Sequence, residues 1–489
     1  MAEQIPDTLL SHLSEFVAAQ MGLHFSRERW TDLERGVKSA AREFGFDSAA
    51  PCIQWLVSSP LTKRQIETLA SHLTVGETYF FREKRSFDVL EERIVPELMR
   101  LRNGTERHLR IWSAGCCTGE EPYSIAISLS KVIPDLQNWK ITILATDINP
   151  GFLKDATRGV YKEWSFRDAP PWLKGRYFQG NGKGCSEVLP AIKTMATFSY
   201  LNLAEDVYPS LLNNTNAMDI IFCRNVLMYF SPDRAKKVAQ KFCRCLVDGG
   251  WLIVSPTEVS HELFSDFITV NFPGVILYRK GSQRLHTFEV AQHPFFESFV
   301  EPTPAIVSPV QSKEPPQLET PQPQTPEQDR DAYTEALQAY TLGDYQGTVD
   351  KILRLPPTEQ NNPLVLALVT RAYANQGNLT EAAQWCEQAI RADKLNPACR
   401  FLLATILEEQ GRHEEAVTSL KHALYLDPNF ALAHFSLGNL MRRQGKSEEA
   451  DRHLTNALAI LRRYSTDKVV PESEGMTAGR LAEMITAMR

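Results

Sequence analysis

The sequence lacks several features that would assign a chain to a class at once. It has nine cysteines but no Cys-x-x-Cys pair, so a zinc site and a disulfide framework are disfavoured and reduced thiols are expected. It has neither a basic, apolar leader nor a run of about 20 apolar residues, so we expect a cytoplasmic protein without direct membrane insertion. Its net charge of −6 is mild and does not indicate a nucleic-acid partner.

Two phosphate-binding signatures are also missing from residues 109–121, LRIWSAGCCTGEE. The apolar run, the small residues and the helical pattern that follows predict a buried parallel strand, a turn and a helix, as at the start of an α/β sheet. The turn is not Gly-x-Gly-x-x-Gly and has no phosphate-loop lysine, which disfavours a dinucleotide or a triphosphate. Glu120 and Glu121 at the helix start suit a cationic ligand, although acids also simply favour a helix N-terminus.

A second acid follows the next predicted strand. Residues 141–146, ITILAT, end at Asp147, where a carboxylate is placed to hold two ribose hydroxyls. A ligand with a ribose, a cationic amino acid end and no phosphate describes S-adenosylmethionine. Apolar runs at 218–225, 251–255 and 275–280 predict further strands, so the pattern indicates a Rossmann-like α/β domain.

Five motifs, in order along the chain, carry a resemblance to a known family. They are TYFFRE at 78–83, WSAGCCTGEEPYSIA at 112–126, ATDIN at 145–149, YLNL at 200–203 and FCRNVLMYF at 222–230. Together they resemble the CheR-type chemotaxis receptor methyltransferases over about residues 5–282. The resemblance implies an N-terminal all-helical domain (1–80) and an S-adenosylmethionine-dependent methyltransferase domain (81–282) with a small antiparallel β-subdomain (about 161–200).

The resemblance also implies site residues. Arg82 and Tyr229 are expected to orient the acceptor carboxylate or the donor. Glu121 is expected to hold the methionine amino group and Asp147 the ribose. The expected cofactor contacts are Gly76, Thr78, Arg82, Glu120, Glu121, Asp147, Asn202, Leu203, Arg224 and Asn225, and no metal is expected.

Other interpretations of these residues remain open. Thr78 and Arg82 would share one face of a helical turn, and Thr78 is equally suited to cap a helix. Tyr229 is also typical of a core or rim aromatic residue. Gly76 stands where the family often has asparagine, which would leave that contact to the backbone. Glu120 would cap the helix or assist Glu121.

The N-terminal helices and the β-subdomain bear on receptor contact. Within residues 28–44, Arg35, Lys38 and Arg42 share the face opposite an apolar stripe. This is typical of a solvated face, while the resemblance implies contact with the acidic methylation helices of a receptor. In the subdomain, residues 175–182 predict a strand before a glycine-rich turn, and 187–200 predict returning strands. The turn does not distinguish family members that dock a receptor C-terminal peptide from those that do not.

The last part of the chain has a different composition. Residues 283–330, rich in Pro and Gln, predict a flexible linker. In residues 331–465, glycines recur 34 residues apart at 343, 377, 411 and 445, which is the tetratricopeptide (TPR) period. Three units are well formed, and in a weaker first unit Thr348 takes the alanine position. The repeats predict a groove for an unknown protein or peptide, and residues 466–489 a tail or capping helix.

Three functional hypotheses follow. The first is a protein-glutamate O-methyltransferase that esterifies chemoreceptor glutamates, releases S-adenosylhomocysteine and is recruited to receptor arrays. An ionised glutamate needs no general base, so alignment and desolvation would supply the catalysis. The second is a catalytically silent S-adenosylmethionine-binding adaptor that acts through its repeats. The third, a small-molecule or RNA methyltransferase, is disfavoured because a basic channel with aromatic platforms is not evident.

Overall fold

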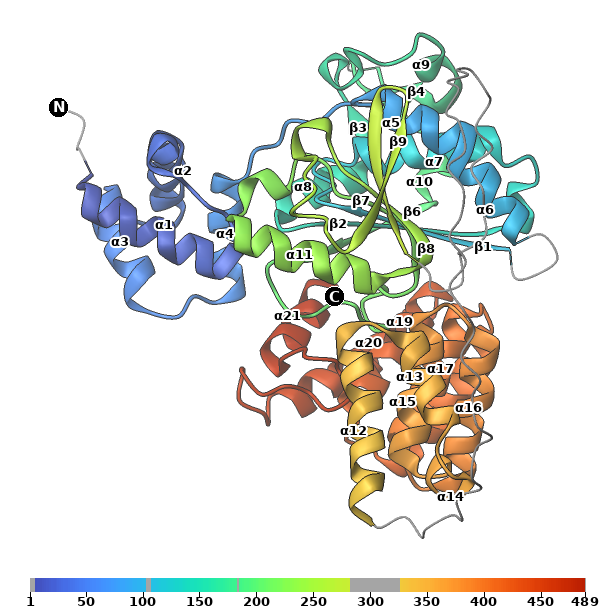
Figure 1. The fold of residues 1–489 in the computed structure, drawn as a ribbon. Helices are drawn as coiled ribbons and strands as arrows, with labels where there is room; N and C mark the ends of the chain where they lie inside the picture. Colours follow the sequence, from blue (N-terminus) through green and yellow to red (C-terminus); the bar gives the residue numbers. More distant parts are fainter. Residues whose placement is uncertain (1–4, 103–106, 183, 282–325, 489) are drawn as a thin grey trace, which may run out of the picture.

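The computed structural model describes residues 5–102, 107–182, 184–281 and 326–488. Figure 1 shows a helical N-terminal domain in blue, a central sheet with its helices, and a stack of helical repeats in orange and red. The predicted linker lies outside the described residues except for its last five, which begin the helix α12 (Pro326–Leu342). Within the described residues, no helix is both long and apolar enough to cross a membrane.

Four helices form the N-terminal domain, in agreement with the all-helical domain that the resemblance implies: α1 (Asp7–Met21), α2 (Trp30–Glu43), α3 (Ala49–Ser58) and α4 (Lys63–Leu73). They pack around a shared apolar core that includes Leu13, Leu33 and Ile53. On the basic face of α2, Arg35 pairs with Asp32 at 2.7 Å and Lys38 pairs with Glu34 at 2.5 Å. The positive charge of this face is therefore partly neutralised within its own helix.

The central sheet has seven strands in the order β6-β2-β1-β7-β8-β10-β9. The first five run parallel, and β10 and β9 complete the sheet as an antiparallel pair. The bounds are β1 (His108–Ala114), β2 (Lys140–Asp147), β6 (Ala196–Tyr200), β7 (Met218–Phe222), β8 (Leu246–Ile253), β9 (Phe267–Phe272) and β10 (Val275–Lys280). The predicted α/β class is confirmed, whereas β9 was not predicted.

Alternate strand residues enter separate cores on the two faces of this sheet. Ile111 and Ile220 pack with the helices α5 (Lys84–Val89), α6 (Val95–Leu101) and α7 (Glu120–Val132). Trp112 and Ile221 pack on the other face with α11 (Pro232–Cys245). Because both faces are covered, functional side chains can reach solvent only at the strand ends.

The small subdomain is a three-stranded antiparallel sheet of β3 (Val160–Tyr161), β5 (Ser186–Val188) and β4 (Phe178–Gly180). Two details of the prediction were wrong. Residues 172–177 form a helix, α9 (Trp172–Tyr177), before β4. The expected strands over 187–200 are interrupted by α10 (Pro190–Lys193), and β6 then pairs with β2 in the main sheet. The antiparallel unit therefore ends before residue 196.

The repeats form four helix pairs, which confirms the predicted period. They are α12 with α13 (Tyr345–Leu353), α15 (Pro363–Asn375) with α16 (Leu379–Ala392), α17 (Pro397–Glu409) with α18 (His413–Leu426), and α19 (Ala431–Arg443) with α20 (Ser447–Leu461). Each periodic glycine ends a first helix with φ between +75° and +83°, a conformation that glycine adopts without strain. In the first pair, the buried Thr348 hydroxyl donates to the Ala336 carbonyl at 3.3 Å.

The repeats dock against the amino ends of the parallel strands, on the lower side of the sheet in Figure 1. The glycine turns at 343, 377 and 411 lie against Arg244, Val247 and Lys140. Lys140 donates to the Glu408 and Glu409 carbonyls at the end of α17, and Arg244 donates to the Thr341 carbonyl near the end of α12. The helix dipole favours a positive charge at a helix C-terminus. Arg110 of β1 also faces Glu409 at 3.6 Å, so the two halves share a charged interface.

Candidate functional site

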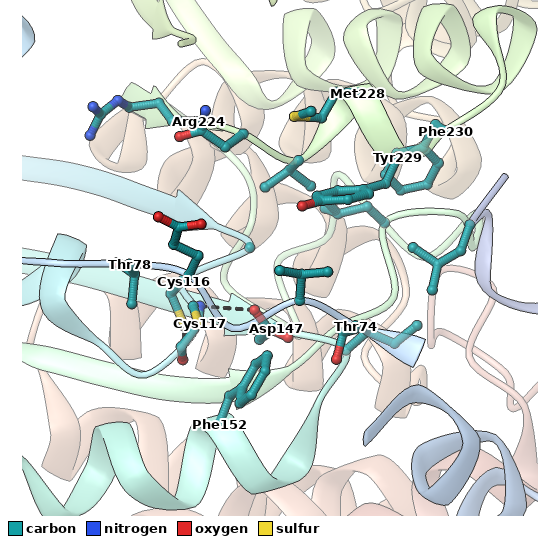
Figure 2. A pocket seen from close by; sticks show the side chains of 18 of the residues that line it. Thr74, Thr78, Cys116, Cys117, Asp147, Phe152, Arg224, Met228, Tyr229 and Phe230 are labelled. Carbon is teal, nitrogen blue, oxygen red and sulfur yellow. Dashed lines mark hydrogen bonds between the residues drawn. The ribbon is translucent and has the colours of Figure 1, made fainter. Parts of the chain in front are cut away.

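A cavity of about 380 Å³ opens at the carboxyl ends of β1, β2 and β7. The α4–α5 linker, residues 73–82, forms one wall, and residues 21–29 of the N-terminal domain form another. Figure 2 shows Asp147 on one side of this cavity and Tyr229 with Met228 on the other. The cavity thus lies where open α/β sheets bind their ligands, with the helical domain as an added wall.

Asp147 ends β2 and is almost fully buried. Its carboxylate accepts hydrogen bonds from the backbone N–H of Cys117 at 2.9 Å and of Asn149 at 2.8 Å. Burial raises the pKa of Asp147 to about 6, although these two hydrogen bonds oppose the change. The side chain is therefore held rigidly, and hydroxyl donors in the cavity would favour its ionised form.

Glu121, in the first turn of α7, also lines the cavity. It accepts from the Ser113 hydroxyl at 2.7 Å and from Arg224 Nη1 at 3.1 Å. Arg224 also donates to Glu83 Oε2 at 2.9 Å and to the Arg82 carbonyl. Burial raises the pKa of Glu121, and the Arg224 charge lowers it. Arg224 therefore fixes Glu121 and the 82–83 segment in place.

Two predicted cofactor contacts lie outside the cavity. The Glu120 carboxylate accepts from the Thr118 hydroxyl at 2.6 Å and from the Ser165 hydroxyl at 2.9 Å, so it ties α7 to the residues after β3. Gly76 is exposed, and a Cβ atom there would lie 2.7 Å from the Phe152 ring, which does line the cavity. Neither residue lines the cavity itself, and their contact with the donor stays a prediction.

Thr78 and Arg82 line the cavity, with Thr78 on irregular chain and Arg82 in a turn that includes Phe81 at φ +57°, so they do not share a helical turn. Thr78 does not cap a helix, because the next helix begins at Lys84 with Glu83 as its N-cap. The Arg82 guanidinium donates to the Glu77 carbonyl at 2.7 Å. That bond leaves most of its N–H donors for other partners.

Tyr229 packs against the core of the N-terminal domain while its ring lines the cavity. The Arg29 guanidinium lies 5.2 Å from the centre of this ring. Burial raises the pKa of Tyr229, and the charges of Arg29 and Arg82 oppose the rise, so the hydroxyl stays protonated at neutral pH. The cavity therefore holds a phenol donor with two guanidinium groups near it.

Sequence reasoning missed Glu258, which holds the loop that carries Arg224, Asn225 and Tyr229. Its carboxylate accepts from the backbone N–H groups of Asn225 at 2.7 Å, Val226 at 2.7 Å and Met228 at 3.2 Å. Asn225 is in the left-handed region, at φ +57°. An acid five residues after the end of β8, in a capping-box spacing with Ser255, was the available signal, although its three contacts with the 225–228 backbone depend on the fold.

Asn202 and Leu203 line the cavity beyond the end of β6. Asn202 is buried, and its side-chain amide donates to the Gln20 carbonyl of α1 at 2.9 Å. The Leu203 carbonyl accepts from the Tyr208 hydroxyl at 2.7 Å and from Lys241 Nζ at 3.2 Å. This segment therefore joins the cavity wall to the N-terminal domain and to α11.

Thiol chemistry has little basis in this site. Burial, together with the nearby Asp147 charge, raises the pKa of Cys116 far above its usual range and that of Cys117 to about 12, so both cavity cysteines stay protonated. Among the described residues, no group of three or more His, Cys, Asp or Glu side chains is placed to hold a metal. The chemistry available is recognition by carboxylates, guanidinium groups and one phenol.

Comparison with known families agrees with this arrangement. The family model described as "CheR methyltransferase, SAM binding domain" matches residues 76–274. A TPR repeat model matches residues 405–445, and one described as "Anaphase-promoting complex, cyclosome, subunit 3" matches residues 347–423.

The chain aligns with curated relatives over most of their length. The chemotaxis protein methyltransferase of Borreliella burgdorferi is 34% identical over 51% of this chain and 87% of the relative. The probable chemotaxis protein methyltransferase of Rhizobium etli is 35% identical over 47% of this chain and 84% of the relative. Chemotaxis protein methyltransferase 1 of Pseudomonas aeruginosa is 36% identical, over 44% and 77%. The chain therefore belongs to the CheR family of chemotaxis protein methyltransferases, with TPR repeats beyond its methyltransferase domain.

Proposed function

We propose that this chain uses S-adenosylmethionine to methylate glutamate side chains of chemoreceptors, giving glutamyl methyl esters and S-adenosylhomocysteine. The observation that carries the proposal is one cavity that brings the carboxylates of Asp147 and Glu121 together with the guanidinium groups of Arg29 and Arg82. The carboxylates suit a donor with hydroxyls and an ammonium group. The guanidinium groups suit an acceptor that is an anion.

The residues at the strand ends fit the donor. Asp147 would accept hydrogen bonds from the ribose hydroxyls, and Glu121 would accept from the methionine ammonium group. Each carboxylate has oxygen lone pairs beyond those used by its protein partners, so each can take a further donor. When bound, the donor supplies an electrophilic methyl group on a sulfonium.

The residues near the N-terminal domain fit a glutamate acceptor. A glutamate carboxylate is ionised at neutral pH and is already a nucleophile. Arg29 and Arg82 would attract it, and the Tyr229 hydroxyl would donate one hydrogen bond to it. The remaining oxygen lone pairs would face the methyl group, so the protein contributes alignment and removal of water.

The test is transfer of labelled methyl groups from S-adenosylmethionine to cytoplasmic receptor fragments from the same organism. We expect label on the fragment that is released as methanol in mild base, because esters hydrolyse there while N-methyl products persist. A base-stable product would contradict the glutamate assignment. Measurable donor binding without label on any fragment would favour the silent adaptor.

A further inference from the structure

Other segments of this chain already fill the groove that the first helices of the repeat pairs line. Leu211 of the methyltransferase domain enters the same apolar core as Phe401 and Phe435 of the repeats. Residues from the C-terminal segment 466–488, Val470 and Met476 among them, enter that core as well. The groove predicted for an external peptide is therefore occupied from both sides.

The filling segment brings two acids to the groove in a Glu-x-Glu spacing. Glu472 forms an ion pair with Arg371 of α15. The Glu474 carboxylate accepts from the Leu211 backbone N–H at 3.1 Å. Both glutamates have positive φ, 63° and 53°, so the backbone turns to present them. The segment thus binds as a ligand would, with apolar anchors on either side of two carboxylates.

The same segment also contacts the methyltransferase domain directly. Arg480, near the start of α21 (Ala478–Met488), forms an ion pair with Glu205. Its guanidinium also lies 5.9 Å from the Tyr200 ring centre, at the end of β6. Figure 1 shows this red segment beside the repeats and below the sheet. Residues 200–211 are therefore held along their outer side by the C-terminal segment.

Those contacts lie a short distance along the chain from the cavity. Asn202 and Leu203 line it, and Glu205 follows two residues after Leu203. The Glu205 carbonyl and the Leu203 carbonyl both accept from Lys241 Nζ, at 2.7 Å and 3.2 Å. A change in how Glu205 is held would consequently reach the wall of the cavity through a rigid, hydrogen-bonded turn.

We propose that residues 466–488 are a built-in ligand of the TPR groove that braces residues 200–211, so that donor affinity depends on the groove being filled. The groove would then prefer an acidic, turn-forming peptide with two carboxylates flanked by apolar residues. An external peptide of this chemistry would compete with the segment and loosen the cavity wall. This inference rests on the proposed S-adenosylmethionine site.

The test uses point variants of the full chain. Arg480→Met removes the ion pair to Glu205, and Glu474→Gln weakens the contact to Leu211 without changing side-chain size. Each should weaken S-adenosylmethionine binding about fivefold in calorimetry, the lower end of usual coupling between sites. The matched control is Arg391→Met, which removes an exposed pair with Glu387 within α16 and should leave the affinity unchanged.

Hydrogen exchange without the donor gives an independent readout. Amides of residues 200–211 should exchange several-fold faster in Arg480→Met than in the wild type or in Arg391→Met. Unchanged affinity and unchanged exchange in variants with wild-type melting temperatures would overturn the inference. A wild-type chain that binds no S-adenosylmethionine would overturn the proposed function instead, and the exchange comparison would still test the brace.

Discussion

The two edges of the central sheet both bury acidic side chains, but in different surroundings. At the amino edge, Asp219 accepts from Arg102 and from the Arg110 backbone, and the buried Glu409 of the repeats faces Arg110. At the carboxyl edge, Asp147 accepts only from backbone N–H groups in the described structure and faces a cavity. Asp219 is held by a cationic partner, whereas Asp147 has no such partner and keeps oxygen lone pairs for a ligand.

Replacing Asp147 in the cavity should have the largest effect on S-adenosylmethionine affinity. Asp147→Ala removes two charge-assisted acceptor sites for the ribose, so S-adenosylmethionine affinity should fall at least about 100-fold. Calorimetry measures this directly. The control is Asp135→Ala, which loses only an exposed pair with Arg107. Affinity within threefold of wild type would remove Asp147 from the binding site.

Replacing Glu409, at the interface with the repeats, should lower the free energy of unfolding and leave S-adenosylmethionine affinity unchanged. Glu409→Gln leaves Arg110 with its bonds to Asn214 and Asn216 but without the opposing charge, so the free energy of unfolding should fall by about 2 kcal/mol. The adjacent Glu408→Gln is the matched control, because its pair with the exposed Arg443 should contribute less than about 0.5 kcal/mol. Denaturant titration compares them. Equal losses would show that the buried Arg110–Glu409 pair stabilises the fold no more than the exposed Glu408–Arg443 pair does.

Much of this comparison could be predicted from the sequence, because periodic patterns report local structure. The strands β1, β2, β7 and β10 follow from apolar runs, and the repeats follow from their 34-residue period. Asp147 and Glu121 could be placed at the carboxyl edge because parallel strands bring their ends together. Their role in binding the donor stays a prediction.

Other features could not be predicted, because they depend on contacts between distant segments. Nothing local separates Glu120 from Glu121, yet helical rotation sends one to Ser165 and the other to the cavity. Arg29 reaches the cavity only because the N-terminal domain packs beside Tyr229. The filling of the TPR groove by residues 466–488 likewise has no periodic signal.

Replacing the Tyr229 phenol should slow methyl transfer without weakening donor binding. Tyr229→Phe keeps the ring against the N-terminal core and removes one hydrogen bond to the acceptor, so methyl transfer should slow about 20-fold. Donor affinity should stay within twofold of wild type. Single-turnover transfer and calorimetry on the same preparation measure both quantities. An equal loss in both would show that Tyr229 supports the donor.

The pH dependence of S-adenosylmethionine binding should show whether the acids at the carboxyl edge bind the donor in their ionised form. Because the pKa of Asp147 is raised to about 6 in the ligand-free protein, its carboxylate is ionised at pH 7.5 and protonated at pH 5. A protonated Asp147 cannot accept from both ribose hydroxyls as well, so affinity should fall about tenfold per pH unit below pH 6. Burial also raises the pKa of Glu121, which acts in the same direction.

Asp147→Asn is the control for that slope, because it cannot titrate. Its affinity should be low at every pH, and its remaining pH dependence should report Glu121 alone. Calorimetry between pH 5 and pH 8, with wild type and variant in the same buffers, measures both curves. Identical slopes would show that protonation of Asp147 does not affect donor affinity between pH 5 and pH 8. The carboxyl edge would then resemble the amino edge, where buried acids only hold the fold together.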